Sequence, residues 1–302
     1  MLIPCIFGIV VLIPIQGYFS RMYYSDILIS YFDYLPLFFH INMNDLSNYR
    51  TGNFTPGHLW FILYLFVLSL IALPLFSYLK GDKRQQFIDS MTNFLYRRWM
   101  IFLLAIPPVI ALFFSPSPGG KNPAYYLIFL IYGYILLHDK RYNSIVDKNK
   151  FVALILMFIL FGANLAISFL EIIPPSSLAN ELMHGLSYSF GTMFCLVVFL
   201  GYGRIFLNIT NRCLRYASSA SYPFYILHQP IIVIVGFHVV KWDVGLPIKF
   251  FAINIFSFAA TLIVYDLIVK RNNVARFLFG MKPQLKKKSK TAQSFISEDQ
   301  TG

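Results

Sequence analysis

The chain has 302 residues, of which 57% are hydrophobic and only 13% are charged, and its mean hydropathy is +0.62. These values exclude an ordinary soluble protein and predict an integral membrane protein. The formal net charge of +12 does not indicate a nucleic-acid partner, because basic loops on one side of a membrane produce the same excess.

Apolar windows long enough to span about 30 Å of hydrocarbon recur along the chain. We therefore predict an all-α fold, a polytopic transmembrane helix bundle of about eight spans. The third and fourth spans are shorter than the others. The predicted spans are Leu2–Phe19, His58–Leu79, Met100–Phe114, Ala124–Leu137, Phe151–Leu170, His184–Tyr202, Ala220–Val240 and Ile248–Val269.

Basic residues are distributed unequally between successive loops. Twenty of the 25 Lys and Arg residues lie in alternate loops and the C-terminal tail, whereas four lie in the other loops. This asymmetry predicts a multi-pass protein of the cell membrane with both termini in the cytoplasm. We assign residues 1–270 to the membrane domain and 271–302 to a basic cytoplasmic tail. From Pro283 its composition is typical of disorder, and its lysines favour contact with membrane lipids.

A polar cluster interrupts the seventh predicted span. Tyr225 and His228 are three residues apart and share a helix face, and Pro230 frees a backbone carbonyl nearby. The imidazole of His228 could accept a proton from a hydroxyl group, with Tyr225 as a hydrogen-bond donor. The alternative interpretation is a hydrogen bond that only locks two helices together.

Two further sets of residues are candidates for the site. His58 begins the second predicted span beside Trp60, although a solvated histidine explains it equally well. Arginines on the predicted cytoplasmic side could hold the phosphates of an anionic cosubstrate, although the topology rule alone also predicts them. These are Arg97, Arg98, Arg141, Arg204 and Arg215. The three cysteines lack metal-ligand spacing, so we expect no metal.

Five stretches in the same order resemble the integral-membrane acyltransferase family 3, particularly the glucan-modifying group called glucan biosynthesis protein C. The most extensive is Tyr222–Pro230, and the others are Leu2–Gly8, Gly57–Phe61, Gly201–Arg204 and Phe277–Lys282.

The resemblance implies about ten membrane helices and transfer of an acyl group from acyl-CoA to a hydroxyl of a sugar or glycan. Family members open with two further helices that carry the histidine taken as catalytic, and no residue here aligns with it. We therefore expect the chain to lack those two helices. Acyl transfer by this chain on its own then depends on whether the reaction requires them. His228, Tyr225 and His58 match polar landmarks of the family, which implies supporting roles for them.

The resemblance leads us to expect acyl-CoA to dock among the cytoplasmic arginines and the acceptor to approach from the loop 20–57. Two other functions remain open. A transporter or flippase would show substrate flux without turnover of acyl-CoA, although the paired repeats typical of transporters are not found. A non-catalytic membrane scaffold, a remnant of the family, would show neither.

Overall fold

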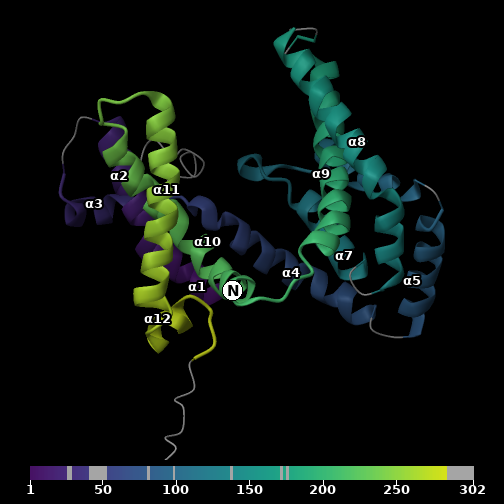
Figure 1. Ribbon diagram of the computed structural model, residues 1–302, viewed down its shortest axis with the longest axis horizontal. Helices are drawn as coiled ribbons and strands as arrows, with labels where there is room; N and C mark the ends of the chain where they lie inside the picture. Colours follow the sequence, from purple (N-terminus) through teal and green to yellow (C-terminus); the bar gives the residue numbers. More distant parts are fainter. Residues whose placement is uncertain are drawn as a thin grey trace, which may run out of the picture. The chain divides into compact units, whose positions relative to one another are not determined.

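The computed structural model (Figure 1) describes residues 1–25, 29–40, 53–79, 82–97, 99–136, 139–170, 173–174 and 177–283. Every regular element within these residues is a helix, which confirms the all-α prediction. The chain forms two compact units. The first unit combines Met1–Trp60 with Tyr216–Gly302, and the second comprises Phe61–Arg215.

The first unit joins helices from the two ends of the sequence. Local signals explain their boundaries: the Ser30 hydroxyl accepts a hydrogen bond from the Asp33 N–H and caps α3, and Asn272 caps α12 in the same way. The π-helical turn η1 ends two residues before Pro14, which has no N–H to continue an α-helical pattern. The elements are α1 (Leu2–Phe7), η1 (Gly8–Leu12), α2 (Ile13–Tyr24), α3 (Tyr31–Phe38), η3 (Gly57–Leu59), α10 (Arg212–Val239), α11 (Leu246–Val264), η6 (Tyr265–Val269) and α12 (Asn273–Leu278).

The second unit is built around two long helices, α8 and α9, which pack side by side (Figure 1). Its core joins them to η4, where Phe102 meets Phe194 edge to face with ring centroids 5.2 Å apart. Helix α4 starts at the last residue of the first unit and continues into the second. The elements are α4 (Trp60–Tyr78), α5 (Asp82–Leu95), η4 (Met100–Ala105), α6 (Ile106–Phe114), η5 (Pro118–Gly120), α7 (Pro123–Leu136), α8 (Arg141–Phe169) and α9 (Leu178–Phe206).

Six helices in the described part of the chain are long and apolar enough to cross a membrane, so the chain is a multi-pass membrane protein. They correspond to six of the eight predicted spans, but most extend beyond the predicted bounds. They are Leu2–Tyr24, Gly57–Tyr78, Arg141–Phe169, Leu178–Phe206, Arg212–Val239 and Leu246–Val269.

The other two predicted spans, which are the shortest, do not form long single helices. Residues 100–114 are divided into the 3₁₀ helix η4 and the nine-residue α6, because Pro107 and Pro108 remove two N–H donors at the junction. Together with Gln86–Leu95 they form a pair bent by 114°, which would make a seventh span if counted as one. Helix α7 has 14 residues and rises only about 21 Å. A straight crossing at either place is therefore not what the structure shows.

The ordered chain continues past residue 270, where we predicted the tail to begin. Helix α12 packs against α1 and η6, and the Arg276 Nε donates to the Lys282 carbonyl oxygen at 2.8 Å. Residues 273–278 therefore belong to the folded first unit. The predicted disorder beyond Pro283 lies outside the described residues.

Candidate functional site

The first unit brings together the three polar residues predicted for the site. The imidazole ring of His58, in η3, lies 5.2 Å from that of His228 and 5.6 Å from the Tyr225 ring, measured between centroids. Tyr225 and His228 share a face of α10, as their spacing predicts, with ring centroids 5.7 Å apart. All three side chains are half-buried.

Backbone carbonyl groups select the tautomers of both histidines. The His228 Nδ1 lies 2.6 Å from the Tyr225 carbonyl oxygen, and the His58 Nε2 lies 3.1 Å from the Ile226 carbonyl oxygen. Because a carbonyl oxygen only accepts hydrogen bonds, the neutral His228 carries its proton on Nδ1 and the neutral His58 on Nε2. The lone pair of His228 is therefore on Nε2, and that of His58 is on Nδ1.

The tyrosine has a different task from the one its sequence position suggested. The Tyr225 hydroxyl donates its single proton to the backbone carbonyl oxygen of His58. The Tyr225 hydroxyl therefore holds the His58 backbone against α10 and has no second proton to donate to a ligand. The same segment is tight on its other side, since Gly57 has φ +53° and a Cβ there would lie 2.6 Å from the Ile13 Cδ1.

A cavity of about 390 Å³ lies beside His228, between α10 and α11. Phe224 and His228 are on one wall, with their rings nearly parallel at an angle of 7°. The α11 wall carries a polar stripe of Asn254, Ser257 and Thr261 among phenylalanines. In the described part of the chain the buried Ser257 hydroxyl has no hydrogen-bond partner. A hydroxyl-bearing ligand would supply one.

Sequence reasoning missed this stripe. Positions 254, 257 and 261 follow the three- and four-residue spacing of one helix face, so the signal was present in the sequence. Each residue is individually common in a membrane helix, and only the cavity shows that they face His228.

The five predicted arginines are not all available to an anion. Arg98 lies outside the described residues, whereas Arg97 and Arg215 are exposed in the second unit. Arg141 forms ion pairs with Asp139 and Asp89, and Arg204 pairs with the Asp147 carboxylate. Two of the four described guanidinium groups therefore contact carboxylates, although Arg204 shares that of Asp147 with the Lys150 ammonium. Their binding of phosphate stays a prediction.

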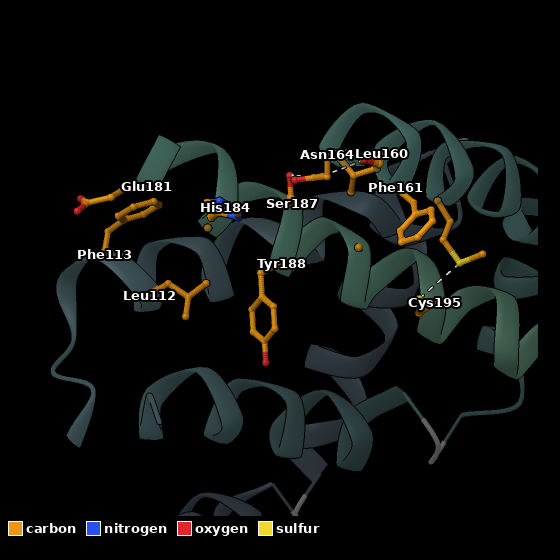
Figure 2. A pocket seen from close by; sticks show the side chains of 13 residues that line it. Leu112, Phe113, Leu160, Phe161, Asn164, Glu181, His184, Ser187, Tyr188 and Cys195 are labelled. Carbon is orange, nitrogen blue, oxygen red and sulfur yellow. Dashed lines mark hydrogen bonds between the residues drawn. The ribbon is translucent and has the colours of Figure 1, made fainter. Parts of the chain in front are cut away.

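A second pocket, of about 620 Å³, lies between α6, α8 and α9 in the second unit (Figure 2). Glu181 and His184 are at its rim, but no hydrogen bond or ion pair joins these two described residues. Asn164 donates to the Ser187 hydroxyl at 3.0 Å and to its own helix, so this polar pair is satisfied internally. The pocket contains none of the three predicted site residues.

Comparison with known proteins gives one match that spans nearly all of the described membrane helices. The sequence model of a family described as an acyltransferase domain matches residues 1–269. No curated protein matches the chain, and no solved structure does either. Because the matched region covers both units and far more than half of the sequence, the chain belongs to the acyltransferase family 3.

Proposed function

We propose that this protein is a membrane-embedded O-acyltransferase that moves an acyl group from acyl-CoA to a hydroxyl of a sugar, glycan or related envelope acceptor. Membership of the acyltransferase family supports acyl transfer. The cavity beside His228 supports a hydroxyl-bearing acceptor, because an imidazole and a stripe of hydroxyl and amide groups line it. The single observation that carries the proposal is the contact of the His228 Nδ1 with the Tyr225 carbonyl oxygen, which leaves Nε2 as the basic nitrogen.

The lone pair on the His228 Nε2 makes the ring a base for the acceptor. With Nδ1 bonded to the Tyr225 carbonyl oxygen, Nε2 accepts the proton of an acceptor hydroxyl as its oxygen attacks the thioester carbonyl carbon. The tetrahedral intermediate then collapses, the carbon–sulfur bond breaks, and the imidazolium returns its proton to the CoA sulfur. The carbonyl partner of Nδ1 favours the transient imidazolium, since both ring nitrogens are donors in that state.

The other site residues position the reacting groups. Tyr225 and His58 hold η3 against α10 through the two hydrogen bonds to backbone carbonyls. Ser257 and Asn254 line the cavity. The Ser257 hydroxyl has no hydrogen-bond partner among the described residues. The Asn254 side-chain amide donates to the Phe250 carbonyl oxygen, and its side-chain oxygen can accept from another hydroxyl of the acceptor. This division gives base and binding groups to opposite walls of one cavity.

The test measures acyl transfer from radiolabelled acyl-CoA to glycans extracted from membranes that contain the protein. We expect His228→Ala to lower the rate by at least about 100-fold, the usual contribution of a general base. His238→Ala is the matched control, because His238 lies on the same helix and does not line the cavity. Equal activity of native protein and His228→Ala would remove His228 from the mechanism.

A further inference from the structure

A larger cavity, of about 740 Å³, lies in the second unit between α7, α8 and α9. Its walls are mainly apolar and aromatic, with Phe129, Leu196 and Leu200 among the residues that line them. It extends along α9 from Tyr188 to Arg204, sixteen residues apart in one continuous helix, which is about 24 Å along the axis. Its length suits an extended fatty acyl chain and far exceeds an acetyl group.

The polar groups in its wall near Tyr188 do not require a polar ligand. The Tyr125 hydroxyl donates to the Thr192 hydroxyl at 2.9 Å, which in turn donates to the Tyr188 carbonyl oxygen at 2.7 Å. Because this chain of hydrogen bonds ends on a backbone acceptor, these hydroxyls are satisfied within the protein. In Figure 2 the Tyr188 ring points away from Ser187 and Asn164. This part of the cavity can therefore be occupied by hydrocarbon at little cost.

The Arg204 end has the opposite character. The Arg204 guanidinium pairs with the Asp147 carboxylate and donates to the Asn143 carbonyl oxygen at 3.2 Å. The same carboxylate also pairs with the Lys150 ammonium at 3.3 Å. One carboxylate shared by two cations leaves one positive charge in excess where Arg204 lines the cavity. An anionic group at this end would be favoured.

We propose that this cavity binds a single long acyl chain whose polar end carries phosphate, with the phosphate at Arg204. The assignment of this ligand as the acyl donor rests on the proposed function, and it makes the donor a long-chain acyl-CoA. Each buried methylene improves affinity about fourfold. Palmitoyl-CoA should therefore bind more than a hundredfold more tightly than acetyl-CoA.

Two glycines provide a matched pair for the test. A Cβ at Gly133, which lines the cavity on α7, or at Gly162, on α8 outside it, would meet nothing within 4 Å. Both positions are helical, so a side chain at either begins in open space. Gly133→Phe should fill the cavity, whereas Gly162→Phe should leave it open. Arg204→Gln tests the anion end, because Lys150 remains to pair with Asp147.

The experiment uses the full chain in phosphatidylcholine nanodiscs and a palmitoyl-CoA analogue with a photoreactive diazirine at the end of its chain. We expect labelled peptides from α7, α8 and α9, with labelling abolished by excess palmitoyl-CoA and unaffected by equal acetyl-CoA. Gly133→Phe should lower labelling at least tenfold and Gly162→Phe less than twofold. Arg204→Gln should weaken binding about tenfold.

Labelling outside these helices, or equal labelling of the two glycine variants, would overturn the proposal. Displacement by phosphatidylglycerol as readily as by palmitoyl-CoA would identify a lipid site and overturn the donor assignment. His228→Ala should label normally, because binding does not require turnover. Normal labelling without acyl transfer by the native protein would therefore contradict the proposed function and leave the acyl-chain cavity intact.

Discussion

The Tyr225 hydroxyl donates a hydrogen bond to the backbone carbonyl oxygen of His58, although the two residues lie 167 positions apart. This contact joins η3 to the middle of α10. The reciprocal bond, from the His58 Nε2 to the Ile226 carbonyl oxygen, closes the connection. Because the bond to Ile226 engages Nε2, the His58 Nδ1 remains without a hydrogen-bond partner among the described residues.

Removal of the Tyr225 hydroxyl should weaken this connection. We expect Tyr225→Phe to lower the free energy of unfolding by about 1 kcal/mol, because the His58 carbonyl loses its donor. Acyl transfer should fall as well, since His58 is no longer held beside His228. Thermal unfolding in detergent and the membrane transfer assay measure the two effects.

Tyr222→Phe is the control, one helical turn away on α10. Its buried hydroxyl has no hydrogen-bond partner among the described residues, so its removal should leave stability unchanged or slightly increased. Equal losses of stability in both variants would show that ring packing, and not the hydrogen bond to His58, is responsible.

Gly57 should resist substitution because of its backbone conformation. Its φ of +53° is in the left-handed region, where a side chain costs about 1–2 kcal/mol. The added Cβ would also press on Ile13, which is fully buried. We expect Gly57→Ala to lower the free energy of unfolding by at least about 1–2 kcal/mol.

Gly236→Ala is the control, at an unobstructed helical position. It should raise the free energy of unfolding by up to about 1 kcal/mol. The same change in both variants would contradict the role assigned to the Gly57 backbone.

The sequence predicts much of this architecture because long apolar segments have few alternatives in a bilayer. Six of the eight spans and the shared face of Tyr225 and His228 follow from hydropathy and helical spacing. The division of residues 100–114 was also readable in principle, since Pro107 and Pro108 are adjacent. An apolar window averaged over a whole span does not register such a local signal.

The site itself depends on contacts that no local pattern contains. The sequence left open whether His58 is a site residue or only a solvated histidine, and its approach to α10 follows only from tertiary packing across 168 positions. Similarly, the pairing of Arg204 and Arg141 with carboxylates on other elements could not be read from their accumulation in loops. Charge patterning predicts the side of the membrane, whereas the partner of each charge is set by the fold.

The Ser257 hydroxyl should matter for the reaction and not for stability. Because it is buried without a described partner, Ser257→Ala removes an unsatisfied group and should leave the unfolding temperature unchanged or slightly higher. In the proposed function it binds the acceptor, so kcat/KM for the acceptor should fall about tenfold, a loss of about 1.4 kcal/mol.

Ser189→Ala is the matched control for this prediction. The Ser189 hydroxyl is also buried and without a partner in the described chain, but it lies in the second unit and lines none of the three cavities. We expect normal transfer by this variant. Unchanged kinetics in Ser257→Ala would exclude Ser257 from acceptor binding.

Asp139 should contribute to the loss of protein stability in acid. It lies between α7 and α8, outside the membrane helices. Its carboxylate accepts hydrogen bonds from the Arg141 Nε at 2.7 Å and the Arg141 backbone N–H at 2.8 Å. These hydrogen bonds hold the pKa of Asp139 below its ordinary value of 3.8. The associated stability is fully present above that value and is lost as the pH falls through it towards the lower pKa of the folded state.

Unfolding temperatures measured in detergent from about pH 6 to about pH 3 test this coupling. Asp139→Asn cannot take up the proton, so its unfolding temperature should fall less steeply at the acid end than that of the native protein. Glu181→Gln is the control, because Glu181 is exposed and takes part in none of the ion pairs of the described residues. It should retain the native acid sensitivity. If the unfolding temperature of Asp139→Asn fell as steeply in acid as that of the native protein, the Arg141 contact would contribute nothing measurable. Carboxylates paired elsewhere, such as Asp147, would then account for the loss of stability in acid.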